Sequence, residues 1–224
     1  MSLKKMPFIA SIILIFLCIA IVVYGKITLK HLNYDEYINN SLYDFILEED
    51  YKDMYNLKEL IIQNSIDDVD SIFNTSSAIL LVTVNGNPKL LGDGIINTCK
   101  IDRIILGDNF KVGQDIKIYD FAAWWNMNES LYLGGSTPLK DGNKYLVFLN
   151  KAKYPNEKDT YYFSSVPYGH ILLNQKINLY IKNETNRITI KEAMNYQFAF
   201  SNDTTSEIIE KYRENCDYII KKIG

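Results

Sequence analysis

The chain has 224 residues and a formal net charge of −3, with 24 lysines and arginines against 27 aspartates and glutamates. This balance lacks the basic excess of a nucleic-acid-binding domain, and a hydrophobic content of 47% is ordinary for a globular protein. The length allows one domain of good size with additional segments.

An uncharged apolar segment occupies residues 6–24, between Lys5 and Lys26. As a helix it would extend about 28 Å, at about 1.5 Å per residue, which is enough to cross the hydrocarbon core of a membrane. A cleaved signal peptide usually has a shorter apolar region, of about 7–15 residues, and a cleavage site of small residues. We therefore predict an uncleaved signal anchor over residues 1–25. It would be a single membrane span that places the C-terminal domain outside the cell, with secretion after signal cleavage as the alternative.

Two cysteines follow this segment, Cys99 and Cys216. Outside the cytoplasm they could form a disulfide bond, or they could remain two separate buried thiols, and their spacing does not decide between these alternatives. The sequence contains no CxxC motif and no cluster of cysteines and histidines. We therefore expect no structural zinc site, no other metal and no cofactor.

We predict a helical segment at residues 26–75. Between residues 34 and 46, side chains recur at the spacing of one helical face. These side chains are Tyr34, Tyr37, Ile38, Ser41, Leu42, Phe45 and Ile46. A near-match to a capping box at residues 65–68 then predicts a short helix that buries Ile66, Val69 and Phe73.

The periodicity changes at residue 77, where apolar segments bounded by turn residues predict β-strands. We expect strands at residues 78–84, 95–105, 116–119, 144–149 and 161–166, with shorter ones at 171–173 and 177–181. Ile104 falls outside the alternation of its strand, which predicts a β-bulge there. The same alternation places Cys99 on the inward side.

The loop at residues 107–113, with the sequence GDNFKVG, joins two of these strands. A phosphate-binding loop would lead into a helix and carry Gly-Lys-Ser/Thr, whereas here a strand follows and that triplet is missing. We therefore interpret the loop as a hairpin connection whose glycines adopt positive φ angles. Phe110 and Val112 are expected to fold back onto the rim of the β-domain.

Residues 183–224 predict C-terminal helices. Residues 189–192 (TIKE) and 204–207 (TTSE) each match a capping box at a helix start. The last helix would place a row of mostly apolar side chains on one face. These are Ile209, Tyr212, Cys216, Ile219 and Ile223.

The stretch TCKIDRIILGDNFKVGQDIKIYD, followed by LKDGNKYLVFLN, resembles a group of bacterial exported proteins. Their domain is similar to the oligonucleotide/oligosaccharide-binding (OB) barrel of the tissue inhibitors of metalloproteinases. The matching residues are Gly107, Asp108, Gly113, Gly142 and Tyr145, and the resemblance covers roughly residues 66–173.

This resemblance implies an α+β fold with a small Greek-key, OB-like β-barrel at residues 76–182. Helices at residues 26–75 and 183–224 would flank the barrel, and one transmembrane helix would precede it. The metalloproteinase inhibitors reach zinc through a cysteine at the start of the mature domain. Here the first cysteine after the apolar segment is Cys99, which argues against inhibition of that kind.

The chain offers few groups for catalysis, and its two histidines are His31 and His170. Cys99 and His170 could form a thiol nucleophile with its base, but an inward-facing thiol in mid-strand is typical of an inert cysteine. Ser164 and Ser165 lack the sequence of a nucleophile elbow. We therefore expect no enzyme and no catalytic residue.

The densest aromatic cluster lies in the loop-like segment FAAWWNMNESLYLGGS and contains Phe121, Trp124, Trp125 and Tyr132. Exposed rings on such a barrel can stack on sugars or bases, whereas the alternative is that these rings pin a long loop to the domain. The sequence predicts a membrane-anchored, non-catalytic binding module outside the cytoplasm. We expect its partner to be a cell-surface protein or a glycan, and not nucleic acid. A protease-inhibitor-like protein and an unrecognised hydrolase are the alternatives.

Overall fold

The computed structural model describes residues 15, 17–18, 42–45, 69–86, 88–91, 94–120, 130–133, 136–152, 159–165, 167–173, 176–181, 188–200 and 205–224. The chain divides into two units, Met1–Asn33 and Tyr34–Gly224, and every element below belongs to the second unit. Within the described part of the chain, no helix has the length and apolar character that a membrane span needs. The predicted anchor at residues 1–25 lies almost entirely outside that part, so it stays a prediction.

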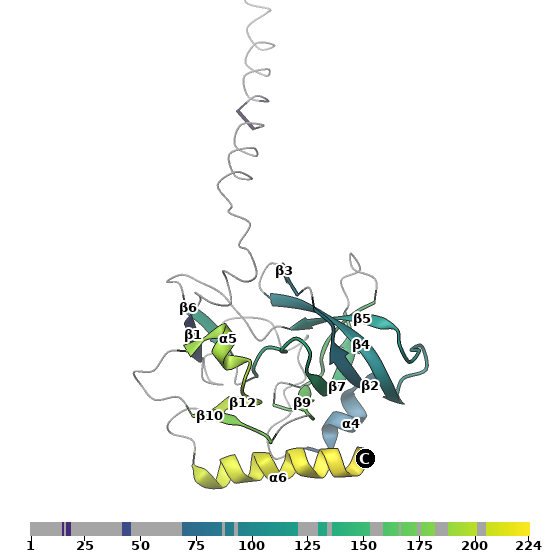
Figure 1. Ribbon diagram of the computed structural model, residues 1–224, viewed down its shortest axis with the longest axis vertical. Helices are drawn as coiled ribbons and strands as arrows, with labels where there is room; N and C mark the ends of the chain where they lie inside the picture. The colour runs from purple at the N-terminus through teal and green to yellow at the C-terminus, as the bar shows by residue number, and fades with distance from the viewer. Residues whose placement is uncertain are drawn as a thin grey trace, which may run out of the picture. The chain divides into compact units, whose positions relative to one another are not determined.

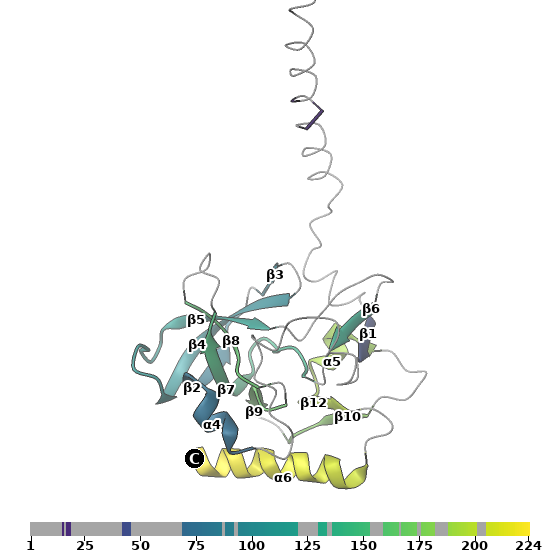
Figure 2. The same cartoon turned by 180° about the vertical axis from the view of Figure 1, so that it is seen from behind.

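Five strands close into a barrel (Figures 1 and 2). In chain order they are β2 (Ala78–Val84), β4 (Gly94–Leu106), β5 (Asp115–Asp120), β7 (Lys144–Lys151) and β8 (Thr160–Phe163). Around the barrel, β2 pairs with β4, β4 with β5, β5 with β8, β8 with β7, and β7 pairs back to β2. The β5–β8 pair is parallel and the other four are antiparallel. The protein is therefore α+β with a closed five-stranded barrel, compatible with an OB-like fold.

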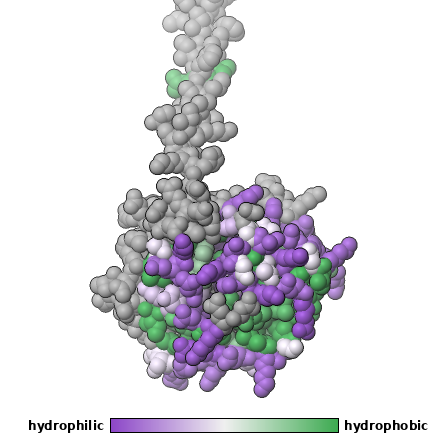
Figure 3. Space-filling view, in the orientation of Figure 1, coloured by the Kyte–Doolittle hydropathy of each residue, from purple (hydrophilic) through white to green (hydrophobic). Residues whose placement is uncertain are grey.

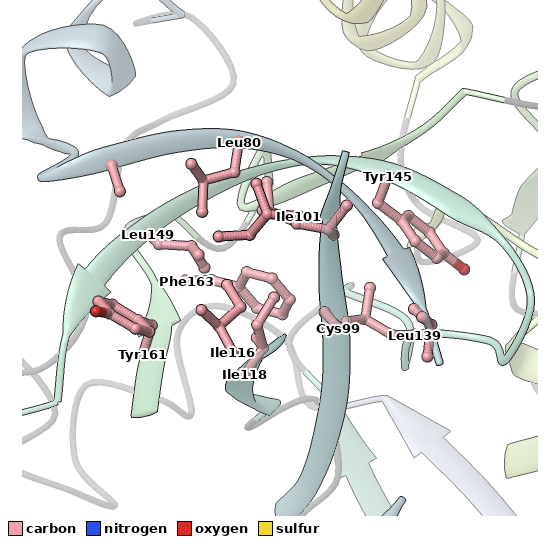
Figure 4. Packing of buried hydrophobic residues seen from close by; sticks show 14 of the residues in the cluster. Leu80, Cys99, Ile101, Ile116, Ile118, Leu139, Tyr145, Leu149, Tyr161 and Phe163 are labelled. Carbon is pink, nitrogen blue, oxygen red and sulfur yellow. The ribbon is translucent and has the colours of Figure 1, made fainter. Parts of the chain in front are cut away.

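Alternate side chains of these strands fill the barrel, because successive residues of a strand face opposite sides of the sheet (Figure 4). Among the buried residues of this inner core are Leu80, Cys99, Ile101, Ile116, Ile118, Tyr145, Leu149, Tyr161 and Phe163. Leu139, from the segment before β7, enters the same core. The predicted inward position of Cys99 is confirmed.

A second, outer core lies against the opposite faces of β2 and β7. Two helices cover it, α4 (Ser71–Thr75) and α6 (Ser206–Ile223), and Figures 1 and 2 show α4 beside the C-terminal half of α6. The outer core contains Ile72, Ile79, Leu146, Phe148, Tyr168, Ile171, Phe198, Phe200, Ile209, Tyr212, Cys216 and Ile219. The predicted apolar face of the last helix is confirmed, with Ile223 partly buried at its end. Its N-cap is Thr205, one residue later than predicted.

Short elements complete the fold. β3 (Lys89–Leu91) pairs with β4, and β9 (His170–Leu172) pairs with β7. A three-stranded sheet contains β1 (Leu42–Phe45) between β6 (Ser130–Leu133) and β11 (Ile188–Thr189). β10 (Leu179–Ile181) and β12 (Phe198–Phe200) form a parallel pair. α5 (Ile190–Ala193) begins with the predicted capping box, in which Thr189 and Glu192 bond reciprocally.

Two sequence expectations need correction, and a third lies partly outside the described residues. The helical prediction for residues 34–46 is wrong at Leu42–Phe45, which forms β1, because pairing with two strands overrides a helical spacing. Val112 does not fold back onto the rim, since 66% of it is exposed, whereas Phe110 does and packs 5.3 Å from the ring of Tyr161. The short helix α4 has Asp70 as its N-cap, and the predicted cap at residues 65–68 lies outside the described residues.

The bulge prediction for β4 is confirmed. Pairing with β2 skips Asp102 and again Ile105, so the irregularities flank Ile104. A bulge increases the local bend and twist of a strand. These two therefore help the long strand β4 to curve from β5 to β2 around the barrel.

The fifth barrel strand is interrupted, and β8 and β9 pair with successive parts of β7. The N–H of Ser164 donates to the carbonyl of Phe148, and the N–H of Phe148 donates to the carbonyl of Gly169. The chain between Ser164 and Gly169 therefore leaves the ladder and returns beside the same residue. Tyr168, which lies in this excursion, is fully buried in the outer core.

Gly169 permits this excursion, and its substitution should be costly. A Cβ atom there would overlap the carbonyl oxygen of Ser165 and lie 2.5 Å from Cβ of Phe163. We expect Gly169→Ala to lower the free energy of unfolding by about 3 kcal/mol in urea titration of the full chain. Gly113→Ala is the control, because Gly113 has a positive φ but open space around it, which predicts a loss of only about 1 kcal/mol. Equal losses in the two variants would contradict the close packing at Gly169.

Candidate functional site

The aromatic cluster proposed from sequence lies mostly outside the described residues. The structure describes only the backbone of Tyr132, in β6. The residues outside the description are Phe121, Trp124 and Trp125, together with the side chain of Tyr132. Phe121 directly follows Asp120, the last residue of β5. The cluster therefore begins where a barrel strand ends.

That end of the barrel is closed by the segment before β7. The N–H of Leu139 donates to Oδ2 of Asp120 at 2.9 Å, and the N–H of Lys140 donates to the hydroxyl of Tyr145 at 3.0 Å. Asp120 is fully buried, and Figure 4 shows Leu139, Cys99 and Tyr145 together at this end of the inner core. Asp120 and Tyr145 thus hold the backbone at residues 139–140, and the Leu139 side chain fills this end of the inner core.

Sequence reasoning missed the buried polar groups of the barrel interior. Asp120 follows Ile116 and Ile118 in alternation, and Asn97 stands between Ile95 and Cys99 in the same way. Asn97 is buried, and its Nδ2 atom has no hydrogen-bond partner among the described residues. A polar residue at an inward position of an apolar strand was the available signal.

Tyr145 connects the groups at this end of the barrel. Burial raises its pKa, the hydrogen bonds with Lys140 and Asn143 oppose that rise, and the charge of Asp120 adds to it. The imidazole ring of His170 lies 5.5 Å from the Tyr145 ring in an edge-on arrangement. The phenol is therefore un-ionised at neutral pH, and its hydroxyl accepts a hydrogen bond from the N–H of Lys140.

The ionisation states of Cys99 and His170 are opposite to those of a catalytic thiol pair. Burial raises the pKa of the Cys99 thiol far above its usual range, and the charges of Asp120 and Asp115 add to the effect. Burial lowers the pKa of His170 to about 4. At neutral pH the thiol is protonated and the imidazole is neutral, whereas a thiolate–imidazolium pair needs the reverse.

Cys216 lies in the outer core, whereas Cys99 lies in the inner core, and both are free thiols. The alternative of two separate buried thiols therefore holds, and the disulfide does not form. Burial raises the pKa of Cys216 to about 12, so this thiol is also protonated at neutral pH.

Gln197 joins the barrel to the C-terminal elements. Its Oε1 accepts from the N–H of Leu172 at 2.7 Å, and its Nε2 donates to the carbonyl of His170 at 2.6 Å. The side-chain amide thus bonds one edge of β9 as a neighbouring strand would. The Gln197 carbonyl accepts from the hydroxyl of Thr137, which lies in the segment that closes the barrel.

The outward face of β4, β5 and β8 is the other concentration of aromatic side chains. Tyr119 lies opposite Ile96 on one neighbouring strand and opposite Tyr162 on the other. Ile96 and Tyr162 are buried and Tyr119 is half-buried, and Lys117 lies one outward position along β5. This outer face (Ile96, Lys117, Tyr119, Tyr162) combines aromatic rings with one cation.

In the view of Figure 3, hydrophilic and hydrophobic side chains alternate over the surface of the Tyr34–Gly224 unit. The large exposed apolar residues described in this unit are Leu106, Val112, Ile181, Ile208 and Tyr218. Within the described ranges, no group of three or more His, Cys, Asp or Glu residues is placed to hold a metal ion.

Comparison with protein-family models and with curated proteins finds no match to this chain.

Both buried thiols should be unreactive in the folded protein. In a Cys18→Ser background, we expect the native full chain to consume no aromatic disulfide reagent and the denatured chain to consume two equivalents. Absorbance of the released thiolate measures both values. Reaction in the native state would contradict the sealed core, and a denatured chain that consumes no reagent without reductant would show a disulfide bond.

The clamp made by Gln197 should contribute strongly to stability. Gln197→Leu leaves the buried N–H of Leu172 and C=O of His170 without their partner, which predicts a loss of about 2–4 kcal/mol in the free energy of unfolding. Gln114→Leu is the matched control, because Gln114 accepts one backbone N–H, from Lys111, at an exposed position. We expect that control to lose under about 1 kcal/mol in the same urea titration. A small loss for Gln197→Leu would show that β9 does not depend on this amide.

Proposed function

We propose that this chain is a membrane-anchored, extracytoplasmic, non-catalytic binding module whose partner is a cell-surface protein or a glycan. The observation that carries the proposal is the burial of Cys99 and His170 within the domain core. A nucleophile and its base must reach a substrate. Here Cys99 is packed in the inner core and His170 against the rings of Tyr145 and Phe163, both in their unreactive ionisation states.

The barrel supplies the binding surface in this proposal. Ligands of OB-fold barrels bind on the face of the second and third strands and on the adjoining loops. In this chain the corresponding strands are β4 and β5, and Lys117 and Tyr119 are the partly exposed residues of their outward face named above. Phe121, Trp124 and Trp125 come within five residues of the end of β5 in the sequence, and we include them in the proposed binding residues.

The chemistry of this surface favours sugars or protein over nucleic acid. Aromatic rings stack on the apolar faces of sugars and are enriched in protein interfaces. A nucleic-acid site needs a basic surface, and the chain has a net charge of −3. The apolar segment at residues 6–24 would hold the domain at the outer side of the cell membrane.

Two binding screens of the full chain in detergent micelles test the proposal. One uses a glycan array, and the other uses the proteins of a cell-surface extract. We expect a ligand whose affinity falls at least ten-fold in a Trp124→Ala/Trp125→Ala variant, because each stacked ring contributes about 1–1.5 kcal/mol or more. Tyr218→Ala is the control, since Tyr218 is an exposed aromatic residue on α6, and it should retain full affinity. Thermal melting checks that each variant is folded.

Two results would contradict this proposal. Turnover of an ester, glycoside or peptide that disappears in Cys99→Ala or His170→Ala would favour a hydrolase. Recovery of a protease that the full chain blocks would favour the inhibitor-like alternative.

A further inference from the structure

His170 is the first residue of β9, and its imidazole is enclosed by aromatic rings. Its centroid lies 5.1 Å from the ring of Phe163 on β8 and 5.5 Å from the ring of Tyr145 on β7. Only 2% of His170 is exposed, and its Nδ1 atom has no hydrogen-bond partner among the described residues. The site therefore accommodates an imidazole whose Nδ1 atom is unpartnered among the described residues.

Burial lowers the pKa of this imidazole, and no charged group among the described residues contributes to that shift. The neighbouring groups are the un-ionised phenol of Tyr145, the phenyl ring of Phe163 and, on the His170 backbone, the neutral amide of Gln197. The charges of Asp120 and Asp115 contribute to the raised pKa of Cys99, whereas the lowered pKa of His170 is due to burial alone. Protonation therefore places an uncompensated charge in an apolar site.

β9 pairs with one barrel strand only, whereas β8 pairs with two. Its three residues pair with Tyr145–Val147 of β7 on one side, and the Gln197 side chain bonds the other side. The barrel itself is closed by β8, which pairs with Leu149–Lys151 further along β7. Movement of β9 would therefore withdraw His170 and Leu172 from one end of the inner core, while the pairing of β8 with β7 is retained.

The excursion that leads into β9 also fixes α6. The ring of Tyr168 stacks on Tyr212 with centroids 5.3 Å apart, and the Tyr212 hydroxyl donates to the carbonyl of Pro167 at 2.8 Å. Asn215 donates to the hydroxyl of Tyr168, also at 2.8 Å. Displacement of β9 would therefore loosen the contact between α6 and the barrel.

We propose that His170 is an acid-sensitive latch: protonation of its imidazole displaces β9, releases α6 and exposes the outer core and the β9 end of the inner core, while the five barrel strands stay paired. Acid favours the open form because His170 binds a proton more tightly there. Its pKa is about 6.5 when exposed to solvent and about 4 in the closed form. Stability of the closed form is therefore complete above about pH 6.5. It falls between about pH 6.5 and pH 4, and the opening constant rises by up to about ten-fold per pH unit.

Hydrogen exchange of the full chain, followed by mass spectrometry from about pH 7 to pH 4 and corrected for intrinsic exchange rates, tests the latch. We expect protection to fall by up to about ten-fold per pH unit in peptides that cover residues 167–173 and 206–223. Peptides that cover residues 78–84 and 95–106 should keep their protection. His170→Phe retains a ring that cannot be protonated and should abolish the pH dependence, whereas His31→Phe, at the other histidine of the chain, should behave as the unmodified protein.

Three results would overturn the latch. One is an unchanged pH dependence in His170→Phe, and another is loss of protection in the barrel peptides in step with those of α6. Should His170→Phe fail to fold, nuclear magnetic resonance of ¹³C-labelled histidine in the unmodified chain decides the question. We expect His170 to become protonated only below about pH 5, together with opening. Protonation of His170 near pH 6.5 while the protein stays closed would be the third contradictory result.

Discussion

β7 is the strand on which the rest of the structure depends. It pairs with β2 along one edge, and with β8 and then β9 along the other, so it closes the barrel and carries the interrupted fifth strand. Its side chains alternate between two cores, with Tyr145, Val147 and Leu149 inside the barrel and Leu146 and Phe148 outside it. A fully buried apolar side chain of this size contributes about 1.5–3 kcal/mol, so both layers draw their stability from one short segment.

The same constraint sets the ionisation states of two buried side chains, Cys99 and His170. Because the barrel is filled from all sides, the groups that could react are held in their neutral forms among apolar neighbours. Polar side chains inside the domain act on the backbone instead: Asp120 and Tyr145 hold the segment that closes the barrel, and Gln197 holds β9. The proposed function therefore assigns binding to the surface, where Tyr119 of β5 is half-buried on the outward face.

Much of the barrel could be predicted from sequence because its strands are continuous apolar segments between strong turn residues. The predicted strand at residues 78–84 coincides with β2, and the face of α6 and the capping box at Thr189 follow from local periodicity and local hydrogen bonding. These features depend on residues close in sequence, where spacing carries the information.

The errors arose where contacts with residues distant in sequence determine the local structure. Leu42–Phe45 forms a strand because β6 and β11 pair with it, and nothing within the segment reveals those partners. Gln197 reads as an ordinary polar residue between helices, yet it bonds the edge of a strand that begins 27 residues earlier. Buried Asn97 and Asp120 could have been found, since each interrupts an alternating apolar row. The aromatic residues proposed for binding, Phe121, Trp124, Trp125 and Tyr132, stay a prediction.

Barrel closure around β7 is the central claim, and nuclear Overhauser contacts between backbone protons test it most directly. Closure predicts cross-strand contacts between Leu80 and Val147, where β2 meets β7, and between Ile118 and Tyr161, where β5 runs parallel to β8. Both sets should be present in the same sample. The absence of either set, with the remaining strand pairs intact, would show an open sheet and would contradict the sealed core on which the functional argument depends.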